Sequence, residues 1–338
     1  MKDLTLDDIA NMAGVSPATA SRVINNLVGS RSKARERVLK VIAETGFQPH
    51  AAARSLASQR SQVIGLLIPA PASAILNHPN VLQLAEVITQ ACHEREYLLS
   101  LFLLGSGVDE QKILPKVTRK GFVDGLIVRG ADDRSSDPLL HKLSAIRMPV
   151  VSLGRPTDLH NISYVATDNA TGTYQAVTHL LNLGRRRVAL LVGSLEPHYS
   201  QERLAAYRNA LTDRGLPLDE DLVAVGGMSD GYLATQRLLR HNPDAIFLPT
   251  RMALDVLRAL REAGRRVPED VALIGFEDLP LAQQTDPPLT TLHQPMAAMG
   301  KQLVGILLDI IENGAAPPRR VVFAQELIVR QSCGALRV

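Results

Sequence analysis

The chain has 338 residues, of which 46% are hydrophobic and 21% charged, which excludes a disordered chain and allows two or three compact units. The net charge of only +3 excludes a generic polycation, but residues 1–60 carry nine Lys/Arg against five Asp/Glu, so +4 lies there and −1 in the remainder. A small basic module on a neutral body indicates a nucleic-acid-binding head, although a solvated helical surface would give the same charge.

The segment LDDIANMAGVSPATASRVI (6–24) predicts two short helices joined by a tight turn. Gly14 supplies the left-handed backbone that ends the first helix, and Ser16 caps a second helix that begins at Pro17. Small and apolar residues share one face of each helix: Ile9, Ala10 and Ala13, then Ala20, Val23 and Ile24, with Thr19 partly buried. A third helix from about Ser32 to Glu44 completes the bundle through Val38, Leu39 and Ile42.

This spacing is typical of a helix-turn-helix, whose second helix enters the major groove. Arg22 suits a bidentate contact to guanine, and Ala18 suits a thymine methyl. Two small-residue helices can also pack at a glycine without binding DNA, but the N-terminal position, the local charge and the linker that follows favour DNA binding. The candidate DNA-binding residues are Thr5, Ser16, Pro17, Ala18, Ser21, Arg22, Asn25, Arg31, Ala53 and Leu56.

Residues 47–61 (FQPHAAARSLASQRS) predict a linker that is marginally helical. Leu56 is a large apolar side chain without a core of its own nearby. In two copies that meet on DNA, the leucines could wedge into a base step of the minor groove and kink the duplex. A flexible alanine-rich tether is the alternative.

From residue 62 onward, short apolar runs alternate with amphipathic stretches, which predicts parallel sheets covered by helices on both faces. The expected strands are Val63–Ile68, Leu98–Leu103, Gly125–Val128, Val150–Leu153, Val188–Val192, Leu222–Val225, Ala245–Leu248 and Val271–Gly275. The expected helices are Val81–Arg95, Gln111–Lys120, Ala170–Leu183, Gln201–Arg214, Gly231–Arg240, Met252–Ala263 and Met296–Glu312.

The chain resembles the lactose-repressor (LacI/GalR) family of bacterial regulators in ordered blocks over nearly its whole length. They are TLDDIANMAGVSPATASRVINN, RERVLKVIAETGFQPHAAARSLAS, VIGLLIP, KGFVDGLIV, DNATGTYQAVTHLLNLGRRRVALLVG, QERLAAYRNAL, LREAGRRVPEDVALIGFEDLPLA, PPLTTLHQP and ELIVRQSC. The resemblance implies a homodimer, hinge helices that fold on a pseudo-palindromic operator, and a two-lobed periplasmic-binding-protein-like core. It places Pro17, Ala18 and Arg22 at base-reading positions and Leu56 at an intercalating one. The chain departs from the family at Pro49-His50 and in the basic run from Arg31 to Arg35.

The expected fold is therefore α/β: a three-helix helix-turn-helix head (1–46), a hinge (47–61) and a core of two doubly wound lobes (62–338). We expect lobe 1 at about 62–160 plus 292–320, and lobe 2 at about 161–291 plus 321–338. An effector would bind in the cleft at the carboxyl ends of the strands.

The resemblance implies that Arg203 is the main ligand-binding arginine and that Glu277-Asp278 contact a sugar. Arg129 ends a predicted strand and could face the cleft or the surface. Thr250 and Arg251 stand where the family usually has an acid, and the core has no Trp and few aromatic residues. We therefore expect a sugar or sugar derivative, with a phosphorylated or acidic ligand held by arginines as one alternative; these arginines could instead pair with acids such as Asp255 and Glu277.

The sequence predicts a transcriptional regulator, with a repressor as the expected type, without cofactor or metal. An exported sugar-binding protein would leave residues 1–60 unexplained, and the acidic MKDLTLDDIA start is unlike a secretory peptide. An enzyme finds no support, because neither GxGxxG after the first strand nor GxxxxGK[ST] occurs. The isolated Cys92 and Cys333 are typical of a reducing compartment, so we expect a cytoplasmic, nucleoid-associated protein.

Overall fold

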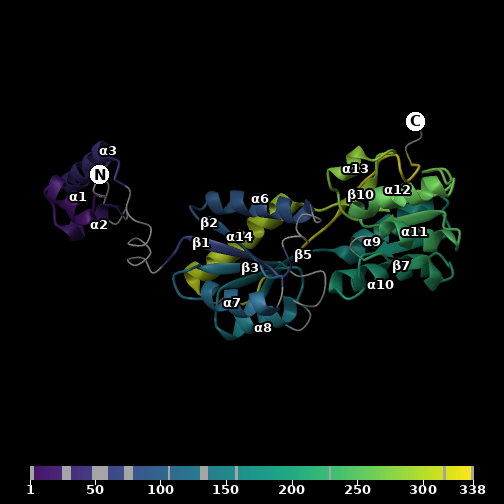
Figure 1. The fold of residues 1–338 in the computed structure, drawn as a ribbon, viewed down its shortest axis with the longest axis horizontal. Coiled ribbons are helices and arrows are strands. Elements are labelled where there is room, and N and C mark those ends of the chain that lie inside the picture. Colours follow the sequence, from purple (N-terminus) through teal and green to yellow (C-terminus); the bar gives the residue numbers. More distant parts are fainter. Residues whose placement is uncertain are drawn as a thin grey trace. The chain divides into compact units, whose positions relative to one another are not determined.

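The computed structural model describes residues 4–24, 32–47, 60–71, 79–105, 107–129, 136–156, 159–227, 230–314 and 317–335 (Figure 1). The chain divides into two compact units, Met1–Gln62 and Val63–Val338. The predicted hinge residues Ala53 and Leu56, and the predicted DNA contacts Asn25 and Arg31, lie outside the described residues.

The N-terminal unit contains three helices, α1 (Leu6–Ala13), α2 (Pro17–Ile24) and α3 (Lys33–Thr45). Their shared core is made of Ile9, Ala10, Ala13, Ala20, Val23, Val38, Val41 and Phe47. The prediction that Leu39 joins this core was wrong, since its side chain is 44% exposed. An α-helix has 3.6 residues per turn, so Val38 lies on the same face as Val41 and Ile42, whereas Leu39 points away.

The first half of the C-terminal unit is a six-stranded parallel sheet in the order β11-β5-β4-β3-β1-β2. Its strands are β1 (Val63–Ile68), β2 (Leu98–Leu103), β3 (Gly125–Arg129), β4 (Val150–Leu153), β5 (Ser163–Thr167) and β11 (Arg320–Phe323). One face packs against α6 (Pro79–His93) and α14 (Met296–Asn313), and the other against α7 (Gly107–Val117) and α8 (Ser136–Ala145) (Figure 1).

The second half repeats this plan with the order β12-β10-β9-β8-β6-β7, in which only the β10–β12 pair is antiparallel. Its strands are β6 (Val188–Val192), β7 (Val223–Val225), β8 (Ala245–Leu248), β9 (Ala272–Gly275), β10 (Thr290–His293) and β12 (Glu326–Ile328). Helices α9 (Asn169–Asn182) and α10 (His198–Thr212) cover one face, and α11 (Gly231–Leu239) and α12 (Ala253–Glu262) the other. Short helical turns lie at η1 (Glu220–Leu222), η2 (Thr250–Met252) and α13 (Leu281–Gln284).

The predicted strands and helices are present, with ends shifted by a few residues. The lobe boundaries need correction, because β5 pairs with β4 and β11 pairs with β5 in the first sheet. The chain therefore enters the second lobe after Thr167 rather than near residue 161, and β11 belongs to the first lobe although we assigned 321–338 to the second. Among the described residues, the strands β5, β10, β11 and β12, the helices α8 and α13, and the turns η1 and η2 were not predicted.

Candidate functional site

The helix-turn-helix of the N-terminal unit is built by local interactions. The side chain of Thr5 accepts a hydrogen bond from the Asp8 backbone N–H, and the Thr5 N–H donates to the Asp8 carboxylate at 2.8 Å, which starts α1 with a capping box. Gly14 ends α1 at φ 61°. The Ser16 hydroxyl then accepts from the Thr19 N–H at 3.2 Å and so caps α2. These contacts fix the angle at which α2 is presented.

Helix α2 exposes the face that the sequence predicted. Ala20 and Val23 are buried, Ser21 is half-buried, and Pro17, Ala18 and Arg22 are exposed. The first turn of α2 carries no acidic residue and its last turn carries Arg22. This arrangement offers a small apolar surface and a guanidinium to a groove.

In the C-terminal unit, Arg203 of α10 is only 5% exposed. Its guanidinium lies 4.1 Å from the centre of the Phe276 ring and 5.0 Å from that of Tyr199, and it donates a hydrogen bond to Asn169 Oδ1 at 3.0 Å. Aromatic faces stabilise a planar cation by cation–π attraction, which is stronger where water is excluded. The rings therefore hold Arg203 in one orientation near the end of β9.

Asn169 joins Arg203 to a second group of charges. Asn169 Nδ2 donates to Glu202 Oε2 at 3.3 Å. Glu202 also forms an ion pair of 3.1 Å with Arg155, which follows β4 of the first sheet, and lies 3.4 Å from His198. This network connects residues of the two lobes.

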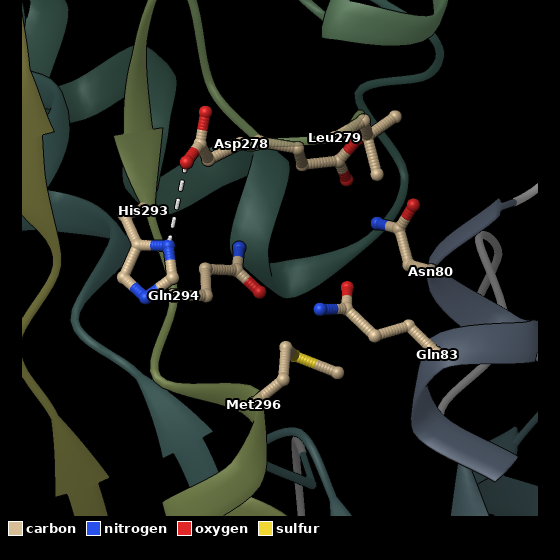
Figure 2. A pocket seen from close by; sticks show the side chains of 8 residues that line it. Asn80, Gln83, Asp278, Leu279, His293, Gln294 and Met296 are labelled. Carbon is tan, nitrogen blue, oxygen red and sulfur yellow. Dashed lines mark ion pairs between the residues drawn. The ribbon is translucent and has the colours of Figure 1, made fainter. Parts of the chain in front are cut away.

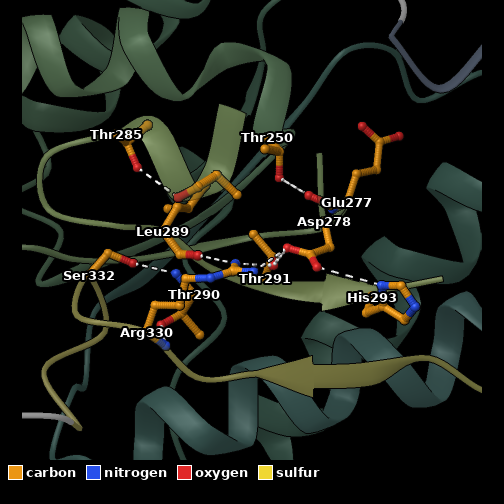
Figure 3. A network of polar contacts seen from close by, with 11 residues as sticks. Thr250, Glu277, Asp278, Thr285, Leu289, Thr290, Thr291, His293, Arg330 and Ser332 are labelled. Atoms are coloured by element: carbon orange, nitrogen blue, oxygen red, sulfur yellow. Dashed lines mark hydrogen bonds and ion pairs between the residues drawn. The ribbon is translucent and has the colours of Figure 1, made fainter. Parts of the chain in front are cut away.

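Asp278 is held by a network of its own, whose side chains Figure 3 shows. Its Oδ1 atom accepts from Arg330 Nη2 and from the Thr291 hydroxyl, both at 2.7 Å, and Oδ2 lies 3.5 Å from His293 Nδ1. Burial alone would raise the pKa of Asp278, but the hydrogen bonds from Thr291 and Arg330 and the nearby positive charges outweigh it and lower the pKa. Asp278 is therefore an ionised structural acid at neutral pH.

Glu277 lies beside this network but differs from its neighbour. The Glu277 carboxylate points away from the Asp278–Arg330 pair (Figure 3), and it lines a pocket with Asn80, Gln83, Asp278, Leu279, His293, Gln294 and Met296. Figure 2 shows the amides of Gln83, on α6, and Gln294, after β10, facing each other across the pocket. Amides opposite a carboxylate provide donors and acceptors for hydroxyl groups.

Thr250 and Arg251 have different environments, although they are adjacent. Thr250 is fully buried; its hydroxyl donates to the Glu277 carbonyl and accepts from the Glu277 N–H. Thr250, which the sequence predicts to contact an effector, thus joins η2 to the backbone of Glu277. The partly exposed Arg251 lies against Gly193, directly after β6, where a Cβ atom would overlap its guanidinium.

Arg129 ends β3 of the first sheet and is half-buried. It is not among the residues that line the pocket of Glu277. Asn80, Gln83, Leu279, His293, Gln294 and Met296 were missed as pocket residues in the sequence. The polar residues that follow β10 could have been found only if that strand had been predicted. The pocket residues of α6 belong to a distant part of the chain, so only the tertiary fold brings them to the pocket.

The described residues contain no group of three or more His, Cys, Asp or Glu side chains suited to a metal ion. Within the same described part of the chain, no helix is both long and apolar enough to span a membrane.

Comparisons with known proteins agree with both units. Residues 5–50 match "Bacterial regulatory proteins, lacI family", and residues 177–333 match "Periplasmic binding protein-like domain". The chain is 34% identical over 335 residues to the HTH-type transcriptional regulator CelR of Thermobifida fusca, covering 97% of this chain and 98% of that protein. It is 31% identical over 340 residues to the ribose operon repressor of Haemophilus influenzae, covering 98% and 99%.

Solved structures give the same result. The lac repressor dimer bound to operator and the anti-inducer ONPF has a TM-score of 0.82 at 28% identity, covering 98% of this chain and 99% of that one. The CelR–cellobiose complex has a TM-score of 0.76 at 32% identity, covering 97% and 99%. The predicted fold class is confirmed, and relatives that regulate transcription confirm that the chain is not an enzyme. The chain belongs to the lacI family of bacterial regulatory proteins.

Proposed function

We propose that the protein is a sequence-specific transcriptional repressor whose affinity for operator DNA is controlled by a sugar or sugar derivative. The main observation behind this proposal is the exposed face of α2, which carries Pro17, Ala18 and Arg22. The turn at Gly14 joins this helix to α1. It acts on chromosomal DNA in the cytoplasm, in association with the nucleoid.

In this proposal α2 is the reading helix. Arg22 donates two hydrogen bonds to a guanine edge, and Ala18 contacts a thymine methyl group. Ser16, at the N-terminus of α2, and Thr5, at that of α1, are suited to phosphate oxygens. Ser21 and Pro17 complete the contact, with Asn25 and Arg31 beyond the described part of α2.

The proposed protein is a homodimer on a pseudo-palindromic operator. Edge strand β2 leaves Leu98 and Leu101 exposed, and the neighbouring α6 leaves Leu82 exposed. Apolar side chains on an open sheet edge favour association with a second copy. Two reading helices related by two-fold symmetry require inverted half-sites, and Ala53 and Leu56 of the two hinges would contact the minor groove between them.

The effector is proposed to bind where the carboxyl ends of the two sheets face each other. Glu277, Gln83 and Gln294 would bind hydroxyl groups, Arg203 would bind an oxygen-rich edge of the ligand, and Thr250 would hold Glu277 in place. Asp278 would act by orienting His293 and Arg330. Ligand binding changes the closure of the lobes and with it the spacing of the two hinges. The ligand binds the two states of lobe closure with different affinities, and this difference sets how far the affinity for DNA can change.

The test measures binding of the full-length protein to a random DNA library and then to the selected inverted repeat. Arg22→Lys keeps the charge but loses the planar fork, so operator affinity should fall about 5-fold to 150-fold, corresponding to about 1–3 kcal/mol, with random-DNA affinity unchanged. Lys40→Ala, which removes an exposed residue paired with Glu44 on α3, serves as the control. Absence of any preferred inverted repeat, with and without sugars, would refute the proposal.

A second variant addresses the hinge. Leu56→Ala should weaken operator binding and leave ligand binding intact, because the proposed wedge touches only DNA. Equal operator affinity in this variant would remove Leu56 from the proposal while leaving α2 as the reading helix.

A further inference from the structure

We propose that the effector carries an anionic group, a phosphate or a carboxylate, which binds between Arg203 and Arg251 at the carboxyl edge of the second sheet. This inference rests on the proposed sensing function and narrows its ligand to acidic sugars. It follows from strand order, from the glycines that make room for Arg251, and from the position of Phe276.

The strand order identifies the point at which a ligand is expected. In the second sheet β6 pairs with β7 on one side and with β8 on the other. The chain therefore reverses its direction of winding between β6 and β8, and ligands of doubly wound sheets bind outside the carboxyl ends of the strands at such a switch point.

Arg251 lies at this switch point. It belongs to η2, immediately after β8, and its guanidinium packs on Gly193, immediately after β6. A side chain at residue 193 would occupy the space of the guanidinium. The neighbouring Thr250 is anchored in the same manner, since a Cβ on Gly275 at the end of β9 would overlap its hydroxyl. The two glycines thus allow η2 to place Arg251 against the residue that follows β6.

Arg203 reaches the same edge from α10, the helix that follows β6. Its guanidinium lies on the Phe276 ring, and the Phe276 N–H donates to the Leu248 carbonyl at 3.0 Å. Leu248 is the last residue of β8 and precedes Arg251 by three positions. Both guanidinium groups are therefore positioned by the adjoining ends of β8 and β9.

The surroundings suit an anion further. Helix α10 begins at this edge without a side-chain cap and without an acid in its first turn, so its N-terminal amides add positive potential. Of the nearby acids, Glu202 is paired with Arg155 and Asp278 with Arg330, whereas Glu277 lines the adjoining pocket. Planar guanidinium groups bind carboxylate and phosphate oxygens in bidentate geometry. The pocket of Glu277, Gln83 and Gln294 would bind the hydroxyl groups of the same ligand.

The experiment compares matched ligands on the full-length protein. Thermal shift and calorimetric titration are run with hexoses and pentoses as neutral sugars, phosphate esters and sugar acids, and with inorganic phosphate alone. We expect the tightest binding from an acidic member, with affinity that falls as salt rises. The phosphate and carboxylate arms then identify which anion is bound.

Variants locate the anion. Arg251→Gln should lower the affinity for the acidic ligand about tenfold or more and leave the neutral parent sugar unaffected, and Gly193→Ala should act in the same direction. Arg258→Gln, on the exposed face of α12 and paired with Glu262, is the matched control and should bind normally.

Two outcomes would overturn the inference. One is a neutral sugar that binds at least as tightly as its acidic derivatives, and the other is an unchanged affinity for the acidic ligand in folded Arg251→Gln; in both cases the sensing function stands. If no sugar of any class binds or alters operator affinity, the proposed sugar sensing itself fails.

Discussion

Removal of the Asp278 carboxylate provides the sharpest test of how the second lobe is held together. Asp278 and Arg330 are each only 15% exposed in their side chains, and their ion pair measures 2.7 Å. In Asp278→Ala, Arg330 keeps its bonds to the Leu289 carbonyl and the Thr291 hydroxyl, but its charge loses its counterion. Breaking a buried pair in this way costs about 3–5 kcal/mol, and the residual exposure reduces our expectation to about 2–4 kcal/mol.

Calorimetry of the full-length protein measures this loss in the transition of the C-terminal unit, where each kcal/mol lowers Tm by about 2–4 °C. Arg330→Met and the double variant complete a cycle, and the double variant should be more stable than the sum of the single losses implies. Glu262→Gln, which breaks the exposed pair with Arg258, should leave Tm unchanged. A change below about 0.5 kcal/mol in Asp278→Ala would refute the reasoning, since that is the usual range for surface changes.

Four further predictions concern the pH dependence of Asp278 and the positions of Gly14, Ala20 and Tyr207. The pKa of Asp278 is lowered in the folded state, so its contribution to the free energy of unfolding is present above its unfolded pKa of about 3.9 and is lost as pH falls through the lower folded value. The stability of Asp278→Asn should therefore depend less steeply on pH in acid unfolding curves, and identical curves would contradict this. Gly14→Ala places a side chain at φ 61° and should cost the N-terminal unit about 1–2 kcal/mol, measured by urea unfolding monitored by circular dichroism; an unchanged midpoint would argue against the turn. Ala20→Leu overfills a fully buried site and should cost about 1–3 kcal/mol and abolish operator binding, while ligand affinity stays normal; retained operator binding would mean that the helices do not cross closely there. Tyr207→Phe removes the bond from the buried hydroxyl to the Val188 carbonyl, 2.8 Å long, and should cost about 1 kcal/mol in calorimetry, whereas no loss would show that this carbonyl is satisfied otherwise.

Local sequence signals were sufficient for most of the fold. Gly14, Ser16 and Pro17 each have a conformational preference that acts within one turn of chain, so the helix-turn-helix could be predicted from residues close in sequence. The apolar strands such as β1 and β6 carry a similarly direct signal, because both faces of a parallel sheet are buried.

Of the strands that were missed, β11 and β12 lie at sheet edges and β10 is short and polar, whereas β5 (SYVAT) is a buried inner strand with a polar residue at each end. β10 (Thr290–His293) reads TTLH, and its two threonines are fully buried. Burial of their hydroxyls is tolerated because Thr290 accepts from the Arg330 N–H and Thr291 donates to Asp278. These partners come from other elements, so no pattern within the strand reveals that it is buried. Without β10, the pocket residues that follow it could not be placed either.

Two pairs of adjacent residues, which we expected from the sequence to have similar roles, have side chains with different surroundings in the structure. Thr250 and Arg251 were both expected to contact an effector, but Thr250 is directed at the Glu277 backbone and Arg251 at Gly193. Glu277 and Asp278 both line the pocket, but the Asp278 carboxylate is held by Arg330 and the Glu277 carboxylate points away from that pair. In each pair the direction of a side chain depends on tertiary contacts, which residue type and spacing do not determine.

Because the two sheets have the same strand order, Arg129 and Arg251 occupy equivalent positions in their two lobes. In each sheet the first strand lies between the second and the third, so the switch points fall between β1 and β3 and between β6 and β8. Arg129 ends β3 and Arg251 follows β8, so each arginine lies on the same side of its own switch point. Arg129→Gln should therefore lower the affinity for an acidic effector as Arg251→Gln does, if the bound ligand spans both lobes. An effect of Arg251→Gln alone would confine the anion to the second lobe and leave the first to bind hydroxyl groups.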